Sequence, residues 1–207
     1  MPVHPLFPQP IYFSNLERSV TKDQLKTVNE YRKEVFENEG NTVSKNKYVL
    51  ENKTLKNLKE DLNKKVIDYF NKVVCTSNTI NPYITQSWLN YTENNQFHHS
   101  HSHPNSYVSG VFYVDAQKEI DTITFHKPGQ HGDASYTDLK LDVDKYNIFN
   151  TTAWVCPVET GNVVLFPSFL HHGVDKKKGT NTRISLSFNS FFKGTIGNTE
   201  NLTELII

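Results

Sequence analysis

The chain has 207 residues, with 22 basic and 22 acidic side chains, so its formal net charge is zero. This balance disfavours nucleic-acid and anionic-membrane binders, which usually carry excess positive charge. No apolar stretch approaches the ~20 residues of a membrane helix, and the proline-rich start lacks the basic region of a signal peptide. Two cysteines cannot build a disulfide framework. We therefore expect a single soluble, cytoplasmic domain over residues 1–207.

The first part of the chain, about residues 20–75, is predicted to be helical. Thr21 and Gln24 have the spacing of a capping box, and apolar residues at helical spacing follow as far as Val35. Gly40 is the predicted end of this first helix. A second helix is expected from one apolar stripe: Leu55, Leu58, Leu62, Val66, Ile67, Phe70 and Val74. Both helices are expected to pack their apolar faces on a sheet.

From about residue 83 the pattern becomes that of β-strands. Short aromatic and β-branched segments alternate with Gly, Pro, Asn and Asp, which is typical of a sandwich, jelly roll or barrel. A long irregular insert, residues 127–152, is a candidate functional loop. The lysine run at residues 176–178 is expected to be the solvated tip of a hairpin. The predicted strands are Thr85–Tyr91, Tyr107–Val114, Thr122–His126, Ala153–Val155, Asn162–Phe166 and Arg183–Phe192.

Histidines are concentrated in one part of the chain, since eight of the nine lie between His98 and His172. Residues i and i+2 of an extended chain point to the same side. His101 and His103 could therefore bind one metal ion, and His99 could compete for the same role. Taken alone, this His-x-His pattern is equally compatible with a polar loop.

A second element near the end of the chain changes that balance. If the lysine–glycine segment is a hairpin, His172 and Arg183 are cross-strand neighbours, and Ser185 shares their face. Arg183 is also the only arginine after residue 32, and a guanidinium binds both oxygens of a carboxylate. Three imidazoles on one face leave coordination positions free, as an iron oxygenase requires. The joint pattern indicates a mononuclear metal site that takes an anionic cosubstrate.

At this point the sequence resembles the Fe(II)/2-oxoglutarate-dependent oxygenases of the prolyl-hydroxylase type, and most closely their small bacterial and phage branch. The resemblance covers about residues 83–192 and implies a mainly β fold with flanking helices, a double-stranded β-helix (jelly roll, cupin-like). It implies Fe(II) and 2-oxoglutarate as cofactors, with ascorbate as an optional addition. The implied reaction is hydroxylation of a small molecule or of a peptide side chain such as prolyl. The Asn- and Lys-rich composition suits a phage or a marine bacterium.

The resemblance also implies a set of metal ligands. The family's His-x-Asp motif falls on His101 and His103, and its distal metal histidine matches His172. The usual carboxylate is thus replaced by His103, which gives a three-histidine site. Alternatively, a nearby acid supplies the third ligand, the candidates being Asp115, Asp121 and Asp133.

The cosubstrate-binding residues follow from the same resemblance. Arg183 and Ser185 match the family's Arg-x-Ser motif. Tyr113 matches a tyrosine that hydrogen-bonds the far carboxylate of 2-oxoglutarate. Tyr91, ten residues before the first metal histidine, matches a tyrosine that lines the cosubstrate pocket. The remaining histidines receive no role: His98, His99, His126, His131 and His171.

Two alternatives from other functional classes stay open at this stage. The first is a cupin-like enzyme that binds its metal through three histidines and does not use 2-oxoglutarate. In that enzyme Arg183 would bind a carboxylate of the substrate instead. The second is a non-catalytic jelly-roll binding module.

Overall fold

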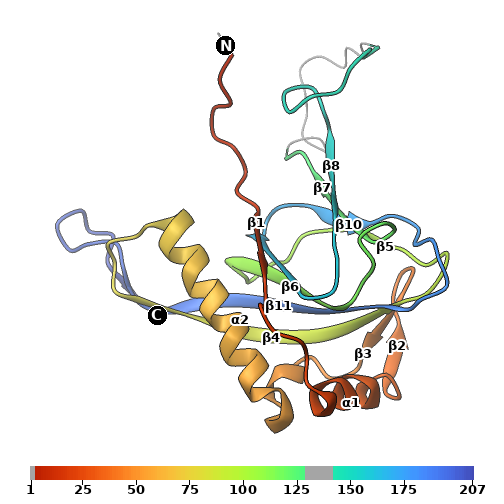
Figure 1. Cartoon of the computed structure of the whole chain (residues 1–207). Coiled ribbons are helices and arrows are strands. Elements are labelled where there is room, and N and C mark those ends of the chain that lie inside the picture. The colour runs from red at the N-terminus through yellow and green to blue at the C-terminus, as the bar shows by residue number, and fades with distance from the viewer. Residues whose placement is uncertain (1–2, 129–141) are drawn as a thin grey trace.

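The computed structural model describes residues 3–128 and 142–207 and contains two antiparallel β-sheets that face each other (Figure 1). The larger sheet contains β1 (Tyr12–Asn15), β2 (Val35–Glu37), β3 (Thr42–Ser44), β4 (Ile80–Thr92), β6 (Val108–Asp115), β9 (Asn162–Pro167), β11 (Arg183–Ile196) and β12 (Leu205–Ile206). The smaller sheet contains β5 (His98–His101), β7 (Thr122–His126), β8 (Ala153–Pro157) and β10 (His172–Val174).

The order of the strands identifies the fold. It is β1-β9-β6-β11-β4-β3-β2 in the larger sheet, with β12 added to β11, and β5-β10-β7-β8 in the smaller sheet. From β4 onward the chain passes repeatedly from one sheet to the other, as it does in a jelly roll. The expected double-stranded β-helix with flanking helices is confirmed. All six strands predicted from residue 83 onward are present, with ends shifted by up to five residues.

Two helices flank the larger sheet (Figure 1). The first, α1 (Lys22–Tyr31), has the predicted capping box, because the backbone N–H of Gln24 donates to Oγ1 of Thr21 at 3.2 Å and the amide oxygen of Gln24 accepts from the Thr21 N–H. The second, α2 (Lys56–Tyr69), follows two 3₁₀ turns at Val49–Glu51 and Lys53–Leu55 and continues into a π-helical turn at Phe70–Val74.

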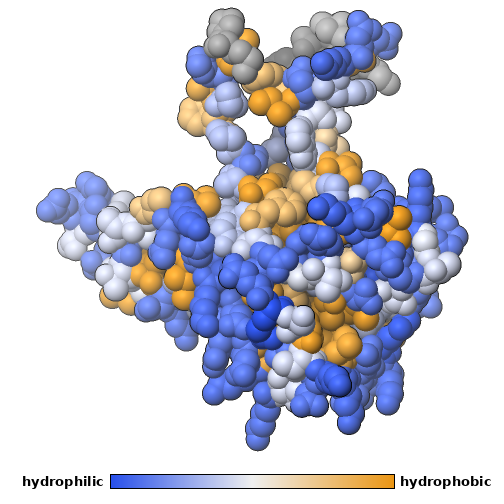
Figure 2. All heavy atoms as spheres, in the orientation of Figure 1, coloured by the Kyte–Doolittle hydropathy of each residue, from blue (hydrophilic) through white to orange (hydrophobic). Residues whose placement is uncertain are grey.

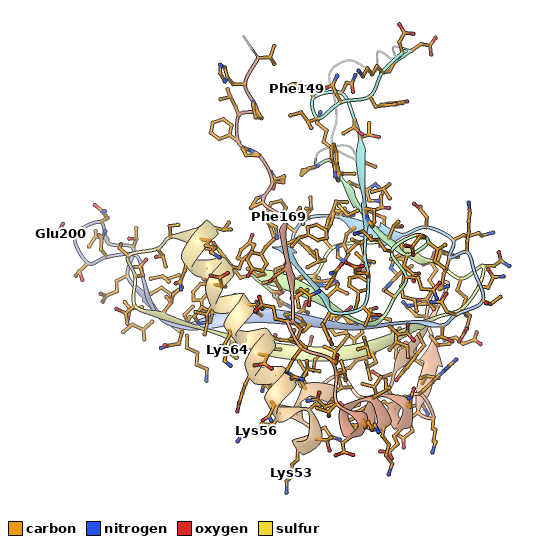
Figure 3. All side chains as sticks on the ribbon, viewed as in Figure 1. Lys53, Lys56, Lys64, Phe149, Phe169 and Glu200 are labelled. Carbon is orange, nitrogen blue, oxygen red and sulfur yellow. The ribbon has the colours of Figure 1, made fainter. Side chains whose placement is uncertain are left out.

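The apolar stripe of α2 forms much of the core on the outer side of the larger sheet. Its members Leu55, Leu58, Leu62 and Val66 are all 0 % exposed. On the opposite side of this region Lys53, Lys56 and Lys64 point into solvent (Figure 3). The face of the molecule in Figure 2 is largely hydrophilic, with apolar side chains in scattered groups. No helix among the described residues is long and apolar enough to cross a membrane.

The predicted length of the first helix is wrong. The helix ends at Tyr31, and Val35 begins the edge strand β2. Gly40 lies instead in the turn between β2 and β3, with a φ of +92° that favours glycine. A Cβ at this position would also lie 2.7 Å from the carbonyl oxygen of Phe97. Pairing of β2 and β3 along the edge of β4 overrides a helical periodicity that continued by chance.

The predicted hairpin between His172 and Arg183 is also wrong. In β10, His172 pairs with His101 of β5, whereas Arg183 pairs with Thr92 of β4 in the other sheet. The lysine run therefore crosses between the sheets. Lys177 is not solvated but 2 % exposed, and its ammonium donates to Oδ1 of Asn181 at 2.8 Å. The sequence spacing could not show this, because a hairpin and a crossover of this length have similar turn residues.

Truncation of the α2 stripe tests the core. Leu62→Ala should lower the free energy of unfolding by about 2–5 kcal/mol, because it removes a fully buried side chain and leaves a cavity. Urea denaturation followed by circular dichroism measures this change. The matched control is Leu25→Ala in α1, whose side chain is 41 % exposed and which should cost under about 1 kcal/mol. Equal losses in the two variants would contradict the packing described for α2.

Candidate metal and cosubstrate site

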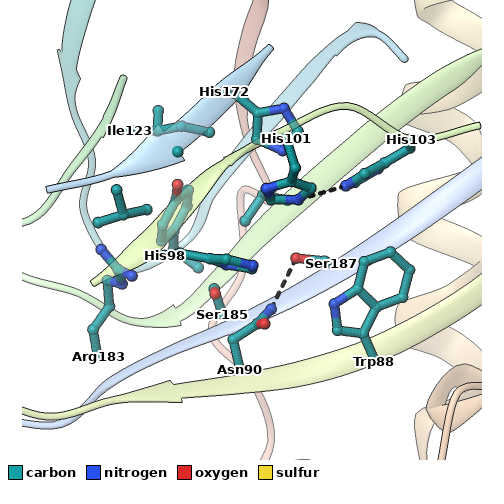
Figure 4. A pocket seen from close by; sticks show the side chains of 14 residues that line it. Trp88, Asn90, His98, His101, His103, Ile123, His172, Arg183, Ser185 and Ser187 are labelled. Atoms are coloured by element: carbon teal, nitrogen blue, oxygen red, sulfur yellow. Dashed lines mark hydrogen bonds between the residues drawn. The ribbon is translucent and has the colours of Figure 1, made fainter. Parts of the chain in front are cut away.

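One cavity lies between the two sheets and is lined by side chains from both (Figure 4). Of the lining histidines, His98 and His101 belong to β5 and His172 belongs to β10. Arg183 is the first residue of β11. The lining residues are Trp88, Asn90, His98, His101, His103, Val111, Tyr113, Ile123, His172, Gly173, Val174, Arg183, Ser185 and Ser187.

The three predicted metal ligands come together at one end of this cavity. His101 and His172 are cross-strand partners at the ends of β5 and β10. His103 lies two residues beyond β5, where its backbone N–H donates to the carbonyl of Ser168 at 2.9 Å. One ring nitrogen from each of the three histidines lies within 4.8 Å of the other two. His103 thus faces the site from the chain after the strand, and not by the strand alternation on which the sequence argument relied.

Each of these rings forms a hydrogen bond through Nδ1 on the side away from the cavity. His101 Nδ1 lies 2.9 Å from the carbonyl oxygen of His99, and His172 Nδ1 lies 3.0 Å from that of Leu170. A carbonyl only accepts, so Nδ1 carries the proton in both rings and Nε2 keeps its lone pair. Such bonds are typical of histidines that bind a metal through the other nitrogen.

The distance between two of the Nε2 atoms provides a test of fit for a metal ion. Nε2 of His101 and Nε2 of His103 are 3.0 Å apart (Figure 4). His101, protonated on Nδ1, directs the lone pair of Nε2 at Nε2 of His103, and at this distance one cation can bind both nitrogens. Two imidazole ligands at about 2.1 Å from one ion and at right angles to each other would lie ~3.0 Å apart. The residues therefore fit a metal ion.

Burial keeps the three rings neutral at pH 7. Desolvation lowers the pKa of His103 to about 4, with a further contribution from neighbouring His101. It also lowers the pKa of His101 and holds that of His172 well below its usual value. Neutral imidazole is the form that binds a metal, so the ligands need lose no proton at neutral pH.

The alternative carboxylate ligands are not found beside the histidines. Asp115 is exposed at the end of β6. Asp121 is buried, and its Oδ2 accepts from the backbone N–H of Gln117 at 2.8 Å. Neither belongs to a group of candidate metal ligands in the described part of the chain. Asp133 lies outside the described residues, as do His131 and half of the predicted functional insert.

Arg183 lies at the other end of the cavity from His103 (Figure 4) and is only 2 % exposed. Its Nη2 donates to Oγ1 of Thr92 at 3.1 Å, whereas its buried Nε has no hydrogen-bond partner among the described residues. Burial lowers the pKa of the guanidinium, and Asp121 acts in the opposite direction without forming an ion pair. A buried guanidinium keeps its charge and needs an anion close by. The vacant Nε and the cavity beside it suit a carboxylate ligand.

Two predicted cosubstrate residues lie close to Arg183. Tyr113 of β6 and Ser185 of β11 are cross-strand partners, and both line the cavity. Desolvation raises the pKa of Tyr113, so its phenol remains a neutral hydrogen-bond donor. With the guanidinium, these hydroxyls supply donors of the kind that a carboxylate requires.

Tyr91 is a correction, because its side chain lies on the opposite face of β4. Its hydroxyl donates to the carbonyl of Val28 at 2.6 Å, and the ring is 0 % exposed in the core beneath the helices. Strand alternation instead directs Trp88 and Asn90 into the cavity. The family spacing gave the correct strand but the wrong face, since one residue of register reverses every side chain.

Several residues of the cavity are not predicted by the sequence pattern. Asn90 and Ser187 are joined across the floor of the cavity by a 2.9 Å hydrogen bond (Figure 4). His98 stacks on His101 with ring centroids 4.5 Å apart, because an irregularity in the β5–β10 pairing directs both side chains inward. Strand alternation from Ser185 would have found Ser187, but no sequence signal marks the irregularity.

Comparisons with known proteins agree with this geometry. Residues 86–189 match the family model described as "Putative 2OG-Fe(II) oxygenase". This segment begins in β4 and ends in β11, so it contains the three histidines, Tyr113 and both residues of the Arg-x-Ser motif. No curated protein is similar enough in sequence to count as a relative.

Solved structures show the same fold at low sequence identity. A prolyl hydroxylase from Trichoplax adhaerens, in complex with a hypoxia inducible factor peptide fragment, has a TM-score of 0.56 at 13 % identity and covers 87 % of this chain and 83 % of its own. A Pseudomonas putida prolyl-4-hydroxylase has a TM-score of 0.52 at 11 % identity, covering 89 % and 92 %. HygX from Streptomyces hygroscopicus, with nickel, 2-oxoglutarate and hygromycin B, has a TM-score of 0.56 at 10 % identity, covering 88 % and 82 %.

The family match therefore spans the strands that carry both ends of the cavity. At one end, three imidazole nitrogens lie close enough together to bind one metal ion. At the other end lies the buried guanidinium of Arg183, whose Nε has no hydrogen-bond partner among the described residues. These are the two parts that a metal-dependent enzyme with an anionic cosubstrate requires. The chain belongs to the family of 2-oxoglutarate- and Fe(II)-dependent oxygenases.

Proposed function

We propose that this oxygenase is a hydroxylase that holds Fe(II) through His101, His103 and His172 and binds 2-oxoglutarate between the metal and Arg183. The observation that carries this assignment is the placement of three Nε2 donors and an unpaired buried guanidinium around one cavity. A cupin-like enzyme without 2-oxoglutarate is disfavoured by the family match, and a vestigial site would have no reason to keep Arg183 buried and unpaired.

When bound, Fe(II) and 2-oxoglutarate supply the oxidative chemistry, in which molecular oxygen is consumed and the cosubstrate becomes succinate and carbon dioxide. The protein's own residues bind and orient. The three imidazoles hold the metal as neutral ligands, and Arg183 with Tyr113 holds the distal carboxylate of the dianion. Apolar side chains in the cavity wall, among them Val111 and Ile123, help to exclude water from the reacting groups.

We propose a neutral group of a peptide or a small molecule as the substrate. A second cavity, an open groove, borders the metal site at His103 and lies between the end of α2, the chain before β6 and the turn after β9. It contains no charged side chain among the described residues, and Tyr107 and Phe169 expose aromatic surface there. The groove lacks the lysines and arginines that contact a nucleic-acid backbone. Its residues are Pro10, Tyr69, Val73, Val74, Ser102, His103, Pro104, Asn105, Ser106, Tyr107, Val108, Pro167 and Phe169.

We place the enzyme in the cytoplasm. Cys75 is exposed and Cys156 is buried, and both are free. Unpaired cysteines of this kind are usual in a reducing compartment. Fe(II) is also kept in its reduced state more readily there.

Replacement of Arg183 tests the proposed cosubstrate site. The wild type should release succinate from 2-oxoglutarate in the presence of Fe(II) and oxygen. Arg183→Lys keeps the charge but loses the two-pronged donor, so 2-oxoglutarate binding to the Mn(II)-loaded protein should weaken by about 2 kcal/mol. Isothermal titration calorimetry measures this affinity. Unchanged 2-oxoglutarate affinity in both Arg183→Lys and Arg183→Ala would remove Arg183 from the site, and absence of succinate from the wild type would contradict the proposed reaction.

Replacement of His172 tests the metal site. His172→Ala removes one of three ligands, so added Mn(II) should raise the melting temperature of the wild type but not of the variant, since a bound metal stabilises only the state that binds it. Each protein is compared with its own metal-free form, because loss of this buried ring also affects packing against Phe166. His171→Ala is the matched control and should retain the shift. If Mn(II) shifted both His172→Ala and wild type equally, His172 would not be a ligand.

The lowered pKa values give a pH dependence. Since burial lowers the pKa of His103 to about 4 and also lowers the pKa values of His101 and His172, the ligands should stay neutral below the usual histidine range. Mn(II) affinity should therefore change less than about threefold between pH 7.5 and 6.0. A site of ordinary histidines, with pKa about 6.5, would be mostly protonated at pH 6.0, and its Mn(II) affinity would weaken steeply over this range. Titration calorimetry at the two pH values checks this. A tenfold weakening at pH 6.0 would show that burial does not protect the ligands from protonation.

A further inference from the structure

A chain of buried serine hydroxyls leads away from His103, the ligand that stands where the family usually has a carboxylate. Nδ1 of His103 lies 2.7 Å from Oγ of Ser109, and that oxygen lies 2.8 Å from Oγ of Ser168. Ser168 in turn lies 2.8 Å from Oγ of Ser106. Ser109 is 0 % exposed and Ser168 is 1 % exposed, so water does not compete for these bonds.

The far end of the chain fixes the direction of every proton in it. Oγ of Ser106 lies 3.2 Å from the carbonyl oxygens of Val108 and Ser190, which can only accept. It also accepts from the backbone N–H of Ser190 at 3.3 Å. The single hydroxyl proton of Ser106 is therefore used on a carbonyl. Ser168 must then donate to Ser106 and has no proton left for Ser109.

Assigning the remaining hydroxyl proton, that of Ser109, determines which atom is the donor at the metal ligand His103. Because Ser168 has no proton left for its 2.8 Å contact with Ser109, Ser109 must supply the proton of that contact, and Oδ1 of Asn189 at 3.2 Å is a second acceptor for the same proton. In either case Ser109 has only a lone pair to offer at 2.7 Å from His103. Nδ1 of His103 must therefore be the donor in that bond, which leaves the lone pair of Nε2 directed at the metal site.

We propose that Ser109 is a positioning residue for His103 and that the serine chain holds this ring in its metal-binding tautomer. In the other two ligands, His101 and His172, a backbone carbonyl holds the proton on Nδ1, because a carbonyl oxygen can only accept a hydrogen bond. A hydroxyl can donate or accept, so at His103 the choice depends on the chain of side chains behind it. The proposal rests on the three-histidine site proposed above and explains how a histidine can occupy the third position without a carboxylate behind it.

The tautomer can be measured directly on the metal-free protein. Long-range ¹H–¹⁵N NMR spectra of ring-labelled wild type should show His103 protonated at Nδ1, which is the minor form of free histidine. In Ser109→Ala this preference should be lost, whereas Ser109→Thr, which keeps the hydroxyl, should restore it. A wild-type His103 protonated at Nε2 would overturn the proposal whatever the variants do.

Metal affinity provides the second measurement. Ser109→Ala should weaken Mn(II) binding 10- to 100-fold, the usual effect of losing the partner of a ligating histidine. The matched control is Ser44→Ala, another fully buried serine, which accepts from the Leu89 N–H outside the cavity and should leave Mn(II) affinity unchanged. If Ser109→Ala does not fold, Ser168→Ala must give a weaker effect of the same kind. Unchanged affinity in the folded variant would overturn the role of Ser109, whereas a wild type that binds no Mn(II) would instead refute the metal site itself.

Discussion

The interaction on which the site depends is the approach of two unprotonated imidazole nitrogens. Nε2 of His101 and Nε2 of His103 lie 3.0 Å apart. With the His103 proton held on Nδ1, as proposed above, their lone pairs repel each other unless a cation lies between them. The protein forces this approach by using Nδ1 of each ring in a hydrogen bond directed away from the cavity. The cluster therefore fits a metal ion, and backbone and serine partners behind the rings hold its geometry.

Charge balance then links the two ends of the cavity. Three neutral imidazoles contribute no negative charge, so a bound divalent ion is compensated by no protein ligand. Arg183 adds a further buried positive charge, and no acidic side chain lines the cavity in the described part of the chain. Low dielectric makes such unbalanced charge costly. A dianionic cosubstrate bound between metal and guanidinium would neutralise most of it, so metal and cosubstrate should favour each other's binding more strongly than in a site with a carboxylate ligand.

The jelly roll makes this arrangement possible by bringing distant parts of the chain to one place. His101 and His172 are 71 positions apart in the numbering but are cross-strand partners in the smaller sheet. Arg183 comes from the larger sheet, and it reaches the same cavity because the chain crosses between the sheets after β10. The long strands β4 and β11 pair along their length and form the floor, on which Asn90 and Ser187 meet.

The sequence by itself determined the strand-rich core, the capped first helix, the apolar face of α2 and, in the cavity, the three histidines and the Arg-x-Ser pair, because periodicity, capping and residue type are local properties. It placed His172 and Arg183 near each other, but through a hairpin that does not exist. Only the tertiary structure decided that these two residues line one cavity from different sheets, that Tyr91 turns into the core, and that His98 turns inward. It also revealed the serines behind His103. These features depend on register, on an irregularity in strand pairing and on contacts between segments far apart in the chain, and each can change without altering the local pattern of residues.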